Sequence, residues 1–262
     1  HLSLLALGIG PGDEVIIPDL TFAATINAVL YVGAKPVLCE IDKDSWCIDT
    51  ENIKYLINKN TKAIIPVHLY GQVCDMAEIE NIAKESNLFI VEDCAEAIGS
   101  LYKGKHVGQF GDAATYSFFG NKTISTGEGG MVLFKDKKIY KFASLLRDHG
   151  MSKKKKYWHD FIGYNYRLTN LQAAVGVAQM ERFEFIIDKK RDIASKYRKI
   201  LSKTKKILSL PSDKENCINS FWLYTILLDP MINRDKVMEK LINVGVETRP
   251  VFYPLHKMDP YK

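Results

Sequence analysis

The sequence has no apolar run long enough to cross a bilayer and no recognisable secretory leader. No hydrophobic stretch among its 262 residues approaches the length of about 20 residues that a membrane-spanning helix needs. The basic, apolar and small-residue blocks of a signal peptide are also missing from its beginning. We therefore expect a cytoplasmic protein that does not contact a membrane.

Cysteine is scarce and scattered. The five cysteines are Cys39, Cys47, Cys74, Cys94 and Cys217, and no two of them form a C-x-x-C pair. An odd number of dispersed cysteines indicates neither a zinc site nor a disulfide framework. We expect reduced, mostly buried thiols and no bound metal.

A strong charge of either sign is missing too. The net charge of +5 is mild and is compatible with an anionic small-molecule substrate. The one basic cluster, at residues 153–156, lacks interleaved aromatic residues, so we interpret it as a solvated loop. Nucleic acid is therefore not expected as a partner.

The two ends of the sequence lack the features of a complete chain. It begins at His1 without a methionine, and residues 2–7 already predict an apolar helix that runs into Gly8. It stops at Lys262 without a closing element. We expect both ends to be cuts through a longer protein.

The first half of the sequence alternates short apolar segments with amphipathic ones. Strands are expected at residues 15–17, 36–41, 63–67, 88–91, 113–118 and 131–134, and helices at 25–31, 50–58 and 75–86. Gly33 is expected to end the first of these helices, and Asp75 with Glu78 has the spacing that opens the third. Strands that alternate with helices predict an α/β fold with a mostly parallel sheet, which collects ligands at the carboxyl ends of its strands.

The second half predicts a different organisation. Residues 168–203 contain no proline and predict one long helix, on which Leu171, Val175 and Ala178 share a face. A strand at 221–228, a helix at 234–243 and a segment at 246–249 then look like the start of a smaller α+β domain. We therefore predict a large domain at residues 1–185 and a small one at 186–262.

Two segments carry residues suited to catalysis. Lys122 lies between two expected strands, in a stretch rich in glycine and hydroxyl residues, where a lysine could form a Schiff base and backbone N–H groups could bind phosphate. Asp93 directly follows an apolar strand, where its carboxylate could bond a pyridinium nitrogen. Each has a simpler interpretation: Lys122 as a surface lysine in a glycine-rich turn, and Asp93 as a helix N-cap.

Taken together, these segments resemble the fold-type-I pyridoxal-5′-phosphate (PLP) enzymes. Within that group the sequence is similar to the DegT/DnrJ/EryC1/StrS family of sugar aminotransferases. The resemblance rests on GDEVIIP at 12–18, TFAAT at 21–25, PVHLYG at 66–71, EDCAEA at 92–97, TGEGGM at 126–131 and GYNYRLTN at 163–170. Many matching segments in the same order are more specific than any single motif.

The resemblance implies a PLP site. Lys122 would bind the cofactor covalently, and Asp93 would bond its ring nitrogen. Phe22 would stack on the ring, with core packing as the alternative. Glu96 stands where many relatives have Gln or His near the ring hydroxyl.

The phosphate end of the cofactor would be shared between two subunits. Ser117 would hold the phosphate, with a strand-end turn as the alternative. Asn165 would reach it from the neighbouring subunit of a homodimer, unless it is a turn residue, and Arg167 is a competing anion ligand. The family's Gly-Thr/Ser-Ala-type turn is absent, so we expect this stretch of chain to bind PLP weakly or not at all.

The substrate expectation follows from two further segments. Residues 117–122 and 247–256 resemble the members of the family that aminate C4 of GDP-4-keto-6-deoxymannose, most often with glutamate as donor. Arg249, His256 and Asn121 are the candidate contacts for the sugar nucleotide. A UDP- or dTDP-linked sugar, a PLP-fold dehydratase and a non-catalytic regulator are the alternatives. Lys122 disfavours the dehydratase, in which His replaces the lysine, and the Asp93–Lys122 pair disfavours the regulator.

Overall fold

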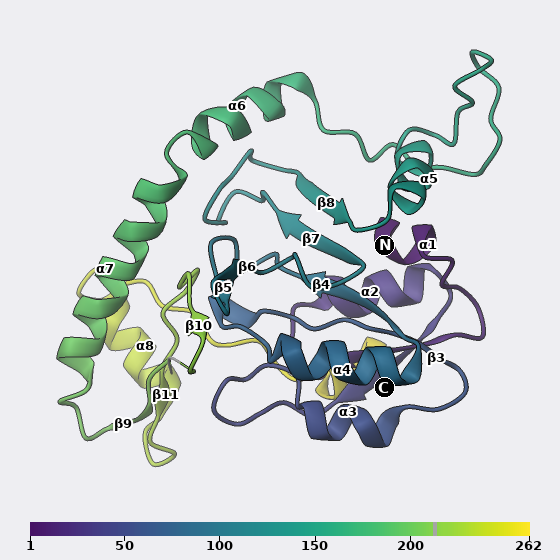
Figure 1. Cartoon of the computed structure of the whole chain (residues 1–262). Coiled ribbons are helices and arrows are strands. Elements are labelled where there is room, and N and C mark those ends of the chain that lie inside the picture. The colour runs from purple at the N-terminus through teal and green to yellow at the C-terminus, as the bar shows by residue number, and fades with distance from the viewer. Residues whose placement is uncertain (212–213) are drawn as a thin grey trace.

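A computed structural model describes residues 1–211 and 214–262 (Figure 1). Its centre is a six-stranded sheet with the order β2-β1-β3-β4-β7-β8. The strands are β1 (Glu14–Pro18), β2 (Lys35–Cys39), β3 (Thr61–Ile64), β4 (Phe89–Asp93), β7 (Ala113–Ser117) and β8 (Gly130–Phe134). Neighbouring strands pair in parallel except β8, which is antiparallel to β7. The predicted α/β fold with a mostly parallel sheet is confirmed.

Helices cover both faces of this sheet. They are α1 (Leu2–Ala6), α2 (Ala23–Tyr31), α3 (Thr50–Leu56), α4 (Met76–Ser86) and α5 (Lys137–Arg147). On one face Ile16 packs with Ile53 of α3 and Ile79 of α4. On the other face, where α2 lies (Figure 1), Val15 and Ile17 pack with Ile26. Because successive side chains of a strand point to opposite faces, the centre of β1, residues 15–17, is apolar on both faces.

Local signals place the helix ends as the sequence predicts. The Asp75 side chain accepts a hydrogen bond from the Glu78 amide and so caps α4. The Glu78 carboxylate does not complete a capping box but pairs with Lys54 of α3 at 2.7 Å. Gly33 follows α2 with a φ of +76°, a conformation that favours glycine.

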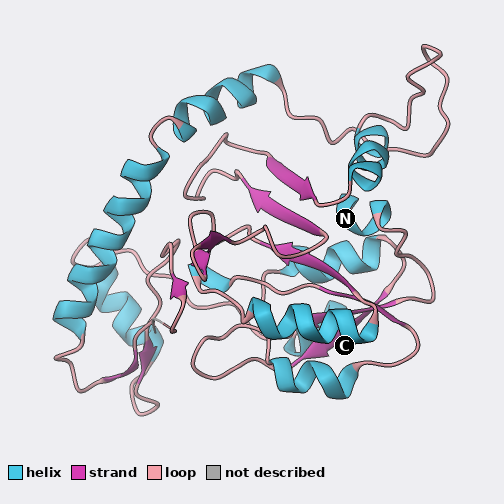
Figure 2. Ribbon diagram, viewed as in Figure 1, coloured by secondary structure: helices cyan, strands magenta, loops and turns pink. Residues whose placement is uncertain are grey.

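The prediction of one long helix at residues 168–203 is wrong in one respect, because this range contains two helices. α6 (Asn170–Met180) and α7 (Phe183–Leu201) are separated where Arg182 leaves helical geometry, with φ −108° and ψ 11° (Figure 2). α7 buries Ile187 and Ala194 against the body of the protein, whereas no residue of α6 is buried. Because of this break, α7 packs against the body of the protein. The face of α6 that carries Leu171, Val175 and Ala178 stays in solvent, with Leu171 83% exposed. None of the helices in the described ranges is long and apolar enough to cross a membrane.

The strand expected at residues 221–228 is also wrong over most of its length. Phe221 has a φ of +50°, which an extended strand does not tolerate. Only β11 (Leu227–Leu228) forms, and it pairs with β9 (Ile207–Ser209). Residues 246–249 form neither helix nor strand, although α8 (Arg234–Ile242) forms as expected.

Among the remaining short elements, a strand of the C-terminal part pairs with a strand of the N-terminal part. β5 (Leu101–Tyr102) pairs with both β6 (Lys105–His106) and β10 (Cys217–Ile218). Single 3₁₀ turns form at η1 (Leu69–Gly71), η2 (Leu255–Lys257) and η3 (Asp259–Tyr261). The division into domains at residue 185 stays a prediction.

Candidate active site

Asp93 and Lys122 lie at the same edge of the sheet. Asp93 is the last residue of β4, and Lys122 follows the end of the adjacent parallel strand β7. A tight turn positions the lysine, whose amide donates to the Phe119 carbonyl at 2.9 Å. We call this edge, where the parallel strands end, the carboxyl edge. It is the place where open α/β sheets bind ligands.

Glu96 joins them from the loop after β4. Its Oε1 lies 3.8 Å from Lys122 Nζ, and only 6% of the Glu96 side chain and 13% of the Lys122 side chain are exposed. Its Oε2 accepts a hydrogen bond of 2.9 Å from the Tyr70 amide. Burial raises the pKa of Glu96 to about 7, although the Tyr70 bond and the charge of Lys122 oppose that shift. A carboxyl group of this kind exchanges its proton near neutral pH.

The amine of Lys122 is also perturbed. Burial lowers its pKa below that of an ordinary lysine, and the charges of Glu96 and Asp93 only partly offset this effect. A lysine that loses its proton more readily serves better as a nucleophile or a base. This environment excludes the simpler interpretation of Lys122 as a surface lysine.

Asp93 is held by two donors. Its Oδ2 accepts from the Thr25 hydroxyl at 2.9 Å, and its Oδ1 accepts from the Ala95 amide at 3.1 Å. No helix begins at this point of the chain, so Asp93 is not a helix N-cap. Each carboxylate oxygen has a second lone pair, so Asp93 can accept a further hydrogen bond from a ligand.

Trp222 completes the surroundings of the lysine, and we did not predict it from the sequence. Lys122 Nζ lies 3.9 Å from the centre of the Trp222 ring. The indole N–H donates to the Asn121 carbonyl at 2.9 Å, and the ring stacks on Tyr70 with centroids 6.1 Å apart. Trp222 is one of only three tryptophans, and this rarity could have drawn attention to it. It lay, however, in a segment interpreted as an ordinary strand.

Phe22 presents its ring at the carboxyl edge. It directly precedes α2, its side chain is 59% exposed, and the Phe252 ring lies 5.6 Å away. This exposure excludes core packing as its role. Phe252 in turn contacts Tyr70, whose hydroxyl accepts from the Phe252 amide at 2.9 Å. A chain of ring contacts therefore runs from exposed Phe22 through Phe252 and the buried Tyr70 to Trp222.

The two residues predicted to hold a phosphate are placed differently. Ser117 ends β7, close to Lys122 in the chain, and its Oγ accepts from the Phe119 amide at 3.3 Å. Asn165 lies on the segment between α5 and α6, which extends away from the sheet (Figure 1). There its side chain accepts from Arg167, which also pairs with Asp148 at 3.2 Å. The contribution of Asn165 to a neighbouring subunit stays a prediction.

Of the predicted substrate contacts, the structure brings His256 and Asn121 to the carboxyl edge. The amide and ring of His256 both bond the carboxylate of Asp19, which follows β1. Asn121 precedes Lys122, and its side chain is exposed. Arg249 is instead exposed and pairs with Glu247 at 3.2 Å.

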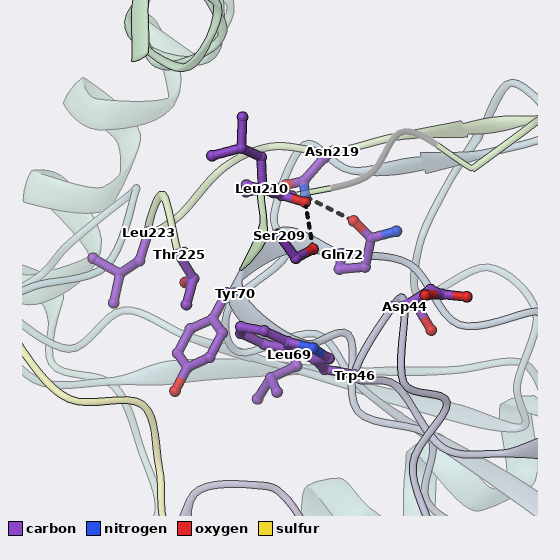
Figure 3. A pocket seen from close by; sticks show the side chains of 12 residues that line it. Asp44, Trp46, Leu69, Tyr70, Gln72, Ser209, Leu210, Asn219, Leu223 and Thr225 are labelled. Carbon is purple, nitrogen blue, oxygen red and sulfur yellow. Dashed lines mark hydrogen bonds between the residues drawn. The ribbon is translucent and has the colours of Figure 1, made fainter. Parts of the chain in front are cut away.

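A nearby cavity is not part of this site. It is lined by Trp46, Tyr70, Gln72, Asn219 and Leu223, among others (Figure 3). Its volume of about 30 Å³ has room for roughly two water molecules. The cavity shares Tyr70 with the site but contains neither Asp93 nor Lys122.

Comparison with known proteins agrees with this geometry. The model of the DegT/DnrJ/EryC1/StrS aminotransferase family matches residues 1–262. The GDP-perosamine synthase of Escherichia coli O157:H7 is 47% identical over 261 residues, which cover 100% of this chain and 71% of that protein. The GDP-perosamine synthase of Caulobacter vibrioides is 45% identical over 263 residues, with the same coverage of 100% and 71%.

The solved structures show the same fold. DesV of S. venezuelae, solved in complex with a ketimine intermediate, superimposes with a TM-score of 0.93 at 33% identity, covering 99% of this chain and 69% of that one. This agreement confirms the fold expected from the sequence resemblance, that of PLP-dependent aminotransferases. The chain belongs to the DegT/DnrJ/EryC1/StrS family and is an aminotransferase.

Proposed function

We propose that the protein is a PLP-dependent aminotransferase that transfers an amino group from an amino acid, glutamate by preference, to a keto sugar carried by a nucleotide. One observation carries this proposal: the buried amine of Lys122, with its lowered pKa, lies beside Glu96 at the carboxyl edge. A lysine that serves only stability or solubility does not need this environment.

The residues at the carboxyl edge fit PLP. Two carboxylates, Asp93 and Glu96, share a single amine, so the pocket can accommodate a further positive charge such as a protonated pyridine ring. Asp93 would hold the ring nitrogen, Glu96 the ring hydroxyl, and the exposed ring of Phe22 would stack on the cofactor. Ser117 would bind the phosphate. When bound, PLP supplies an electron sink for the negative charge that develops on the α-carbon of the amino acid.

Lys122 has two tasks in this scheme. Its amine would hold the cofactor covalently, and as a free amine it would accept the proton from the α-carbon of the amino acid. The second task requires an uncharged amine, which burial favours. Glu96, whose pKa lies near 7, can hold a proton beside it.

We further propose a GDP-linked 4-keto-6-deoxy sugar, GDP-4-keto-6-deoxymannose, as the acceptor, with GDP-perosamine as the product. The 47% and 45% identity to two GDP-perosamine synthases across the whole chain supports this choice. Asn121 and His256, both at the carboxyl edge, would contact the sugar. Arg249, an exposed cation, would meet the diphosphate.

A homodimer with a shared site is part of the proposal. Apolar side chains on and near α6 are uncovered: Ile162 is 91%, Leu171 83% and Val177 62% exposed. Exposed apolar surface of this kind marks an interface between proteins. Asn165 precedes α6, so burial of this surface against a second copy would bring Asn165 close to the partner.

A competition assay tests the function. Equal amounts of GDP-, UDP- and dTDP-linked 4-keto sugars are offered with glutamate, and the products are separated by mass. We expect the GDP-linked 4-amino sugar to dominate. Dominant amination of a UDP or dTDP sugar would contradict the GDP assignment alone. No amination of any of them by PLP-loaded protein would contradict a nucleotide-sugar acceptor.

A further inference from the structure

We propose that Trp222 is a positioning residue for Lys122, holding its amine through the indole ring and its main chain through the indole N–H. This inference rests on the proposed role of Lys122 as the lysine of the aminotransferase. Trp222 lies 100 positions along the chain from Lys122, in the segment that follows β10. The C-terminal part of the protein would thus control the reacting group of the N-terminal part.

The ring contact covers one side of the amine. Lys122 Nζ lies 3.9 Å from the ring centre of Trp222 and 3.8 Å from Glu96 Oε1. Asp93 is the other charged group that acts on the amine. An aromatic face at this distance attracts an ammonium group and displaces water from it. The amine is therefore confined between an aromatic face and a carboxylate.

The hydrogen bond fixes the main chain next to the lysine. The indole N–H donates to the Asn121 carbonyl at 2.9 Å, one residue before Lys122. One side chain therefore holds both the base and the tip of the lysine. Phenylalanine at this position would keep an aromatic face but lose the bond, which makes the two functions separable.

Trp222 is itself held in place by buried contacts. Its ring is 8% exposed and stacks on Tyr70 at an interplanar angle of 15°. Its carbonyl accepts from Lys190 of α7 at 3.2 Å. Two residues earlier, the buried Ser220 hydroxyl lies 2.9 Å from the Ser100 hydroxyl, in the loop after β4. The Tyr70 ring thus holds the Trp222 side chain, and the other two contacts hold the backbone that carries it. A side chain held in this way can set the position of a flexible lysine.

The experiment combines three variants: Trp222→Phe, Trp222→Leu and, as a matched control, Trp46→Phe. Trp46 packs against the same apolar cluster as Trp222 and Tyr70. In the cofactor-free protein, acetylation of Lys122 is followed by peptide mass spectrometry as a function of pH. With PLP supplied in excess, because we expect weak binding, kcat and the KM for glutamate are measured.

Removing the ring has two opposing effects on the Lys122 pKa: water reaches the amine, and the ammonium form loses its contact with the ring. Because burial is the largest cause of the lowered pKa, we expect hydration to dominate, so the midpoint of Lys122 acetylation rises towards that of an ordinary lysine in Trp222→Leu. In Trp222→Phe and Trp46→Phe the midpoint should stay at the wild-type value. We expect Trp222→Phe to lower kcat by about fivefold, the effect of one lost hydrogen bond, with KM within about twofold. Trp46→Phe should leave kcat unchanged.

An unchanged midpoint in folded Trp222→Leu, or an unchanged kcat in Trp222→Phe, would overturn the proposal. If Trp222→Leu does not fold, the kcat of Trp222→Phe decides alone. Acetylation needs neither cofactor nor substrate. A wild-type protein without aminotransferase activity would therefore contradict the proposed function while leaving the acetylation result readable.

Discussion

At the scale of single residues, the titration of Glu96 makes the stability of the fold depend on pH. An unfolded glutamate loses its proton near pH 4.5, whereas folded Glu96 keeps its proton until about pH 7. The folded state therefore binds more protons between these values, and the contribution of Glu96 to stability falls as pH rises through this window. The groups that face it are the Lys122 amine, the Asp93 carboxylate and the Tyr70 amide.

We expect Glu96→Gln to remove this pH dependence. Relative to wild type, the variant should gain up to about 3 kcal/mol of unfolding free energy between pH 5 and pH 8. Urea unfolding at a series of pH values measures the difference, with exposed Glu239→Gln as the control. A constant difference between Glu96→Gln and wild type across this range would refute the titration of Glu96.

Glu92, next to Asp93, has a structural role, and its pKa is shifted in the opposite direction to that of Glu96. It is fully buried and accepts bonds from His68 and from the amides of Gly108, Phe110 and Gly111. Burial raises its pKa, but the His68 contact and these amides outweigh that effect, so the net shift is downward. Its stabilising contribution is therefore complete above the pKa of the unfolded glutamate and is lost as pH falls through the folded value.

Replacing this carboxylate should be costly. Glu92→Gln puts an NH₂ group among N–H donors, and we expect a loss of about 2–4 kcal/mol in unfolding free energy at pH 7. Chemical denaturation measures the loss, and Glu85→Gln on the exposed surface of α4 should change stability little. A loss no greater than that of the control would show that Glu92 is not structurally required.

At the scale of elements, the approach of the segment after β10 to η1 depends on a glycine. A Cβ on Gly71, which has a φ of +96°, would lie 2.5 Å from the Asn219 side-chain oxygen and 2.8 Å from the Phe221 amide. Gly104 has a similar φ of +76° but open space around its Cα. Alanine at Gly104 would therefore introduce backbone strain alone, whereas alanine at Gly71 would add a steric clash.

We expect Gly71→Ala to destabilise the protein by about 1–3 kcal/mol more than Gly104→Ala, because it displaces the segment that carries Trp222. Thermal unfolding gives the difference in stability. Acetylation of Lys122 should reach its midpoint at higher pH in Gly71→Ala only. Equal behaviour of both variants would mean that the segment adapts without moving Trp222.

At the scale of the whole molecule, α6 buries none of its residues and leaves Leu171, Val175 and Val177 exposed. We expect the double variant Leu171→Lys/Val175→Lys to weaken the proposed homodimer, since it places two charges on an apolar interface. Light scattering on a sizing column measures the mass, and Val244→Lys, at an exposed position just after α8, is the control. A dimer of unchanged stability in the double variant would show that the interface lies elsewhere.

The sequence by itself determined the layered sheet, because apolar strands such as residues 88–91 must be covered on both faces. It also placed Asp93 and Lys122 at one edge, because parallel strands end together. Only the tertiary structure decided the break between α6 and α7, because helical propensity is local and the direction of a helix depends on what it packs against. The contact of Trp222 with Lys122 was also decided by the tertiary structure. No local sequence pattern predicts which distant side chain covers a lysine, since that contact exists only after the chain has folded.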